Sequence, residues 1–193
     1  MKKSVRFAAL LCVFVMLCML LASCDADGEQ LTGTVTGIPT LSNYDRFYIK
    51  IDGNDGQSYD SQHNRWIDVL DFEFGSESGD LATGKSSSFK DLTFIHLVDR
   101  ATPRLQSDCM KGSHIATATL HACRAINGKQ EVVLAVKMDI VQVVSADVSV
   151  LDDGRVIETV KLSCEKMTWT VTQVNIDNSL GGNVEDSYTI RKY

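Results

Sequence analysis

The 193-residue sequence has little proline and no concentration of positive charge. Its 2 proline and 13 glycine residues are too few for a collagen-like or low-complexity chain, and its 44% apolar content is too high for a disordered one. The 19 lysine and arginine residues never form a run of five, and 25 acidic residues outnumber them to give a net charge of −6. These features predict one globular domain and no nucleic acid partner.

The sequence also lacks an apolar run of the usual length of a membrane-spanning helix. Its longest apolar run, Phe7–Ala22, has 16 residues, whereas a spanning helix needs about 20. Lys2, Lys3 and Arg6 precede this run. A positively charged start followed by a short apolar run is typical of a secretory signal peptide.

The apolar run ends at Leu21-Ala22-Ser23-Cys24, which resembles a bacterial lipobox. In lipoproteins of that type the cysteine is acylated and becomes the first mature residue, so we predict lipidation at Cys24; the alternative is a signal peptide that is simply cleaved. Asp25 resembles the inner-membrane retention signal of enterobacterial lipoproteins. We therefore expect a membrane-anchored lipoprotein that faces the periplasm, with the inner membrane favoured by Asp25. If the start site is misassigned, the alternative is a cytoplasmic protein that is then secreted.

These signals divide the chain into three parts. Residues 1–23 are the predicted signal peptide, residues 24–44 a tether that contains glycine, threonine and serine, and residues 45–193 the folded domain. The mature chain would carry 16 basic residues against 25 acidic ones, a net charge of −9. We therefore expect an acidic domain held near a lipid surface.

From Asp45 onward, apolar residues recur at every second position, which is the period of a half-buried strand. The sets that share one strand face are Phe47, Ile49 and Ile51; Leu70, Phe72 and Phe74; Leu92, Phe94 and His96; Val132, Leu134, Val136, Met138 and Ile140; and Val160, Leu162 and Cys164. A change of phase at Glu165-Lys166, before Met167 and Trp169, predicts a β-bulge. Asn127-Gly128 predicts a tight hairpin turn, and Asp153-Gly154 repeats that signal.

One helix signal interrupts the strands. Thr102 can cap the start of the helix, Pro103 fits its first position and Gly112 can close its end, while Leu105 and Cys109 share a face. At least six strands with hairpin turns and a single short helix predict a mainly β fold. The expected architecture is an antiparallel β-barrel with one short flanking α-helix, because closure hides the strand edges.

Two segments suggest chemistry that their surroundings do not support. Ser58, Asp60 and His63 suggest a hydrolase, but the loop lies between two strands and lacks the glycine pattern of a nucleophile elbow. The segment 52–56 suggests a calcium loop, yet the sixth position is not glycine and the twelfth is His63 rather than glutamate. A hydrolase that uses the Ser58 loop stays only as a third hypothesis.

The remaining histidine and cysteine residues give no metal-binding pattern. His96 alternates with apolar residues, so we expect a hydrogen-bonded core residue, and His114 and His121 have no partner at metal-ligand spacing. Besides Cys24 the mature chain has three cysteines, Cys109, Cys123 and Cys164, none of them in a Cys-x-x-Cys pair. We expect these three to be small apolar side chains rather than zinc ligands or a disulfide framework. The sequence therefore predicts no catalytic residue, no metal site and no cofactor.

Eight short segments follow one another in the sequence, and their order identifies a protein family better than any single segment does. They are Tyr48–Gly53, Gly56–Asp60, Phe89–Phe94, His96–Pro103, Gly112–Ile115, Cys123–Ala125, Glu158–Leu162 and Trp169-Thr170. In this order the sequence resembles, over about residues 45 to 172, the haemolysin-coregulated protein (Hcp) family, which forms the inner tube of bacterial type VI secretion systems.

The resemblance implies a structural, cargo-carrying protein rather than an enzyme. It implies a small β-barrel with a flanking helix and a homo-oligomer in which hexameric rings stack into a tube, with the spike tip, the sheath or secreted effectors as partners. Val133, Ala135, Val141 and Val143 lie opposite the apolar face of their strand, so we expect them to be exposed and to support self-association. The alternative is a membrane-tethered lipoprotein that binds a ligand or partner without forming rings.

Overall fold

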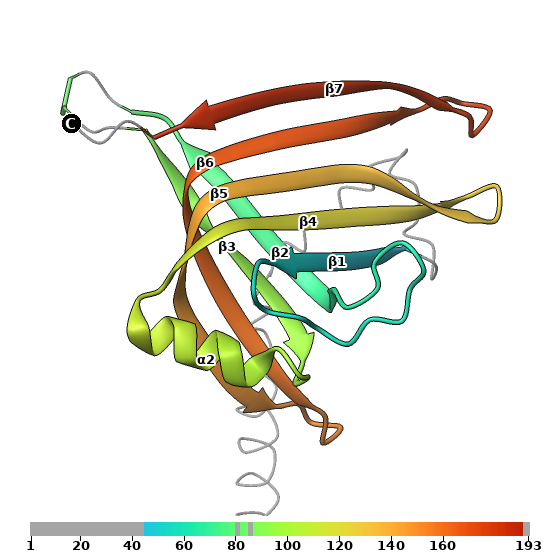
Figure 1. The fold of residues 1–193 in the computed structure, drawn as a ribbon. Coiled ribbons are helices and arrows are strands. Elements are labelled where there is room, and N and C mark those ends of the chain that lie inside the picture. The colour runs from blue at the N-terminus through green and yellow to red at the C-terminus, as the bar shows by residue number, and fades with distance from the viewer. Residues whose placement is uncertain (1–44, 80–81, 85–86, 191–193) are drawn as a thin grey trace, which may run out of the picture. The chain divides into compact units, whose positions relative to one another are not determined.

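Seven β-strands and one α-helix make up the part of the chain that the computed structural model describes, residues 45–79, 82–84 and 87–190 (Figure 1). In chain order they are β1 (Arg46–Ile51), β2 (Ile67–Glu77), β3 (Ser88–Leu97), α2 (Thr102–Lys111), β4 (His114–Ile126), β5 (Lys129–Val150), β6 (Val156–Val174) and β7 (Leu180–Thr189). The predicted signal peptide, Cys24, Asp25 and the tether lie outside the described residues. Within the described ranges, no helical segment has both the length and the apolar character needed to cross a bilayer.

The strands form one antiparallel sheet that closes on itself. Their order is β3-β2-β1-β4-β5-β6-β7, and β3 also pairs with β6. The long strand β6 makes this closure possible because it offers one edge to two partners in succession. Its first half pairs with β3 from Ile157 to Leu162, and its second half pairs with β7 from Lys166 to Val174. The predicted antiparallel barrel with one flanking helix is therefore confirmed.

Three neighbouring strands bend at the same level, at Ala116 in β4, Ile140 in β5 and Glu165 in β6. The pairs on either side of this level are Thr117↔Asp139 and Ile115↔Val141 between β4 and β5, and Asp139↔Lys166 and Val141↔Cys164 between β5 and β6. Figure 1 shows the course of β5 and β6 through this bend. Ile140 adopts a φ of 56°, which a β-branched residue rarely does.

The bend reverses which side chains face the core. Val136 and Met138 point inward before it, and Val141 and Val143 are buried after it, whereas Ile140 is 50% exposed. The predictions that Ile140 shares the inner face and that Val141 and Val143 are exposed are therefore wrong. In β6 the predicted change of phase is present at Glu165-Lys166, but the register is the same on both sides, so the strand kinks without an inserted residue.

The predicted face of β2 is wrong at Leu70. A register shift between Val69 and Asp71 moves the inward positions, so that Ile67 and Val69 face the core and Leu70 is exposed. Phe72 then packs partly buried against the core. Because a bulge shifts the two-residue period by one, the sequence alternation alone placed Leu70 on the wrong side.

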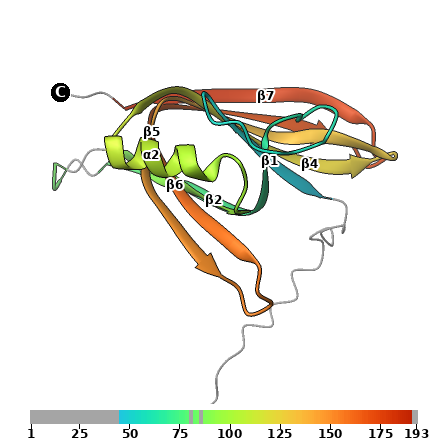
Figure 2. The ribbon, with the colours of Figure 1, turned by 60° about the horizontal axis from the view of Figure 1, so that its bottom comes forward.

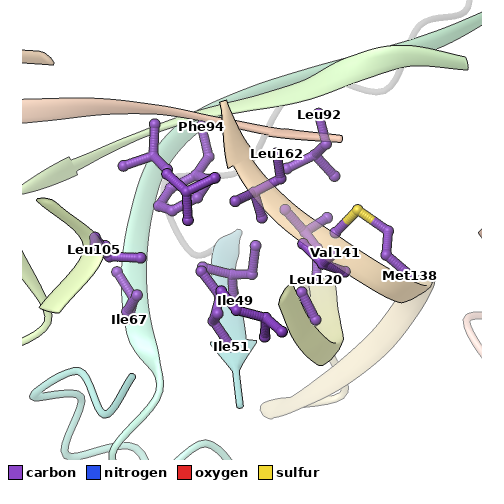
Figure 3. Close-up of a cluster of buried hydrophobic side chains, with 14 of the residues drawn as sticks. Ile49, Ile51, Ile67, Leu92, Phe94, Leu105, Leu120, Met138, Val141 and Leu162 are labelled. Carbon is purple, nitrogen blue, oxygen red and sulfur yellow. The ribbon is translucent and has the colours of Figure 1, made fainter. Parts of the chain in front are cut away.

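The core fills the barrel with side chains from every strand of the ring and from α2. Figure 3 shows Leu105 of α2 beside Ile67, with Ile49 and Ile51 of β1 near the centre of the cluster. Burial of such aliphatic side chains supplies most of the favourable free energy of folding, about 1.5–3 kcal/mol for each. The helix thus closes one end of the barrel through Leu105.

The local sequence signals correctly predicted the end of the helix and the hairpin turn, but not the residue at the N-cap of the helix. Gly112 ends α2 with a φ of 61°, as predicted, but the residue at the N-cap is Ala101 rather than Thr102. Its backbone N–H donates to Asp99 Oδ1 at 2.8 Å, so the turn before the helix is fixed by an aspartate instead. Asn127 and Gly128 both have positive φ, which confirms the predicted tight turn between β4 and β5.

Candidate functional site

The loop between β1 and β2 folds back over the outer face of β1 and β4. His63 at the end of this loop is only 2% exposed. Its ring stacks on Tyr48 with centroids 4.2 Å apart and meets Trp66 edge-on at 4.9 Å. Tyr48 points away from the barrel core, and it is buried because the loop covers it. This aromatic cluster binds the loop to the barrel.

A chain of hydrogen bonds runs through His63. Its Nδ1 donates to Asp60 Oδ1 at 2.8 Å, and its Nε2 lies 3.0 Å from His121 Nδ1. The Asp60 carboxylate also accepts the backbone N–H groups of Gln62 and His63. Burial would raise the pKa of Asp60, but these hydrogen bonds outweigh it and lower the pKa. Burial, with a smaller effect of His63, lowers the pKa of His121 to about 4, so this ring is neutral at pH 7.

The geometry of a serine hydrolase is not assembled around Ser58. Ser58 is buried, and its Oγ accepts the backbone N–H of Asp60 at 3.3 Å. Both ring nitrogens of His63 are directed at Asp60 and His121, so neither activates the hydroxyl. The structure thus joins the Asp60 carboxylate to the His63 ring, whereas the Ser58 hydroxyl contacts only the backbone of Asp60.

Cys123 lies beside this cluster, and sequence reasoning missed it as a neighbour of His63. Its Sγ lies 3.9 Å from His63 Nε2, across 60 residues of sequence. The side chain is 1% exposed, and burial raises the pKa of the thiol to about 11, so it is protonated at pH 7 and a poor nucleophile. Only the pairing of β1 with β4, in which Tyr48 lies opposite His121, brings these residues together.

In the acidic segment 52–56, which suggested a calcium loop, the polar side chains form hydrogen bonds and an ion pair with other residues of the protein. Asp52 Oδ2 accepts the hydroxyl of Thr117 at 2.9 Å, and Asn54 Nδ2 donates to Asp108 Oδ2 at 3.2 Å. Asp55 forms an ion pair with Arg65. These contacts fix the loop to β4 and α2. Among the described residues, no three histidine, cysteine, aspartate or glutamate side chains are arranged to hold a metal ion.

His96 is the buried, hydrogen-bonded core residue that the sequence predicted. Its Nε2 lies 3.0 Å from Glu158 Oε2, and both side chains are fully buried. Gln106 of α2 donates to Glu158 Oε1 at 2.6 Å and to the carbonyl of Ala146 at 2.9 Å. Burial raises the pKa of Glu158, but the hydrogen bonds from His96, Thr102 and Gln106 lower it on balance. This buried pair therefore attaches the helix to β3 and β6.

Two exposed surfaces stand out on the part of the barrel that the structure describes. The strand β7 pairs with β6 alone among the described strands and is exposed along nearly all its length; Val184 on it is 59% exposed. The hairpin that joins β5 and β6 exposes Val148, Val150 and Val156. Figure 2 shows this hairpin extending away from the β7 side of the sheet. An unpaired strand edge and an apolar hairpin are typical contact sites for another protein.

The described chain is thus a closed antiparallel barrel whose loop and helix are held by buried polar clusters, and whose β7 strand and β5–β6 hairpin are exposed. The family model described as "Type VI secretion system effector, Hcp" matches residues 48–171. The chain belongs to the Hcp family of type VI secretion proteins.

Solved structures agree with this assignment. The chain is 28% identical to Hcp1 from Salmonella typhimurium, with a TM-score of 0.65 over 76% of this chain and 95% of that one. It is 27% identical to a type VI secretion system effector from Yersinia pestis, with a TM-score of 0.63 over 75% and 99%. The secreted protein Hcp3 from Pseudomonas aeruginosa, at 15% identity and a TM-score of 0.55 over 77% and 98%, shows the shared fold alone. No curated protein matches the sequence.

Proposed function

We propose that this protein is a ring-forming subunit of a type VI secretion tube, with hexameric rings that stack and that carry or dock effectors. Its membership of the Hcp family supports a tube-like subunit. The observation that carries the assembly step is the free edge of β7, whose backbone groups have no strand on their outer side among the described residues. A long unpaired edge is a liability for a monomer unless another chain covers it.

A closed ring of identical subunits needs two different surfaces on each subunit, because the contacts run head to tail. The edge of β7 and the valines of the β5–β6 hairpin lie on separate parts of the barrel and supply two such surfaces (Figure 1). The exposed valines that we had expected at 141 and 143 are replaced in this role by Val148 and Val150. One of the similar structures, that from Yersinia pestis, is described as a type VI secretion system effector, which supports a role in secretion.

The test of assembly is native mass spectrometry of residues 25–193. We expect hexamers, and a Val184→Lys variant should lose them because a charge replaces an exposed apolar side chain of β7, which is not so at the polar Asn183. The matched control is Asn183→Lys, which adds the same charge at the neighbouring position. A wild-type monomer that persists at high concentration contradicts the proposal and favours the tethered binding module that forms no rings.

We further propose that Cys24 carries a lipid anchor that holds the domain at the membrane. The support is the sequence Leu21-Ala22-Ser23-Cys24 after a short apolar run. In cells fed a labelled fatty acid, Cys24→Ala should lose the label and Cys12→Ala should keep it. A label that persists in Cys24→Ala, or a native protein that fractionates as soluble, would overturn the anchor.

A further inference from the structure

A hollow of about 360 Å³ lies between the end of the β2–β3 hairpin and the last residues of β7. In Figure 1 these two elements meet near the C-terminal end of the described chain. Three aromatic side chains line it, Phe89 from β3, Trp169 from β6 and Tyr188 from β7, and Glu77 and Asp186 lie among its other lining residues. It is separate from the valine hairpin and from the His63 cluster.

The aromatic rings are held in fixed positions by one another. Phe89 meets Trp169 with centroids 5.9 Å apart at 72°, and it meets Tyr188 at 5.8 Å and 89°. The Tyr188 hydroxyl lies 2.8 Å from Ser87 Oγ, which fixes the far end of that ring. Rings from three strands therefore form a prepared apolar surface, and a ligand would not have to order them on binding.

Among the described residues, the charged side chains that line this hollow are acidic. Of the described residues that line it, Glu77 and Asp186 are charged, and the five others that are not aromatic are serines. Asp186 lies opposite Trp169 in the pairing of β6 with β7, so a carboxylate stands beside the indole ring. Glu77 is itself engaged, with Lys90 3.9 Å away and both side chains exposed, so a cation in the hollow would exchange with a surface ion pair.

We propose that this hollow binds an arginine or lysine side chain presented by a partner protein. A cation placed over aromatic faces gains attraction from the ring quadrupoles, and arginine also stacks on such faces while it bonds to carboxylates. The apolar stem of either side chain would cover the rings while the charged end meets Glu77 and Asp186. The serine hydroxyls add acceptors for the remaining N–H groups.

The test uses the full chain in detergent and a fluorescent hexa-arginine peptide, with binding followed by polarisation. The double variant Glu77→Gln, Asp186→Asn should weaken binding by about tenfold or more, because two charge-assisted contacts are lost. The matched control is Glu73→Gln, Glu185→Gln, which removes the same charge from the same two strands; Glu185 bonds to Thr170, away from Trp169. This control should bind within about twofold of wild type. Tyr188→Ala, a change at a half-exposed ring, should also weaken binding.

Several results would overturn the inference. Equal losses in both double variants would mean that the peptide follows overall charge, and equal binding of a hexa-glutamate peptide would mean that the hollow does not select a cation. A change of oligomeric state in the Glu77→Gln, Asp186→Asn variant would mean that the hollow belongs to a contact between copies. The oligomeric state is measured in parallel. If the wild-type protein forms rings but does not bind the peptide, this inference fails and ring assembly stands. If it binds the peptide as a monomer, ring assembly fails and this inference stands.

Discussion

His63 Nε2 lies 3.0 Å from His121 Nδ1, although 58 residues separate the two histidines in the sequence. This contact joins the loop after β1 to the middle of β4. Together with the stacking of His63 on Tyr48, this contact holds the polar loop between β1 and β2 against the outer face of the barrel. Of the residues that suggested a hydrolase, Asp60 and His63 thus stabilise the fold.

Removal of the His63 side chain should destabilise the protein strongly. His63→Ala deletes a buried ring and leaves Asp60 and His121 without their shared partner, so we expect a loss of about 2–4 kcal/mol in the free energy of unfolding. Urea unfolding followed by circular dichroism measures this loss. His114→Ala, at an exposed position, is the control and should change stability by less than about 0.5 kcal/mol. A loss as small in His63→Ala as in the control would contradict the role of the cluster.

Stability should fall in acid partly through His121. Its pKa is lowered from 6.5 to about 4 in the folded protein, so below pH 6.5 the unfolded chain binds a proton that the folded chain does not. The stability contribution is complete above pH 6.5 and is lost as the pH falls toward 4. Urea midpoints measured between pH 7 and pH 4.5 should therefore decline less steeply in His121→Gln than in wild type. Parallel declines in the two proteins would show that His121 does not contribute.

Thiol reactivity should separate the three cysteines of the barrel. Cys123 is buried, and burial raises the pKa of both Cys123 and Cys164 to about 11, so the thiolate that reacts is scarce in each. A thiol reagent should label Cys123 and Cys164 slowly in the folded protein. In urea it should label all three cysteines of the barrel rapidly. Mass spectrometry of single Cys→Ala variants identifies the sites. Three fast thiols in the folded protein would contradict the burial.

Replacement of Cys109 or Cys164 by alanine should cost about 1 kcal/mol, the effect of a small cavity, and leave the oligomeric state unchanged. Both side chains are half-buried and pack against the core. Urea unfolding of each variant gives the cost. A change in oligomeric state would instead place a cysteine in a contact between copies.

Ile140→Asn should stabilise the protein. Ile140 holds a φ of 56° and is 50% exposed, and asparagine tolerates this conformation better than a β-branched side chain. We expect a gain of about 0.5–1 kcal/mol. Val148→Asn, also exposed and on the same strand, lacks the positive φ and should bring no gain. Destabilisation of Ile140→Asn beyond that of Val148→Asn would show that the isoleucine side chain matters more than the strain.

Local sequence signals determined the strands, the turn and the helix. The alternation of Leu92, Phe94 and His96 matches their burial in β3, because a single strand with one buried face needs no information from its neighbours. Asn127-Gly128 and Gly112 act through their own backbone conformation, so their roles could also be predicted. The ordered segments that resemble the Hcp family were enough to indicate the barrel.

Tertiary structure alone decided the inward face of β5 and the surroundings of His63. The inward side of β5 reverses at Ile140 because β4, β5 and β6 bend together, and no single strand contains that information. Cys123 meets His63 only after β1 pairs with β4 and the loop folds over them. Contacts between residues distant in the chain depend on strand register, and a change of one residue in register moves every side chain to the opposite face.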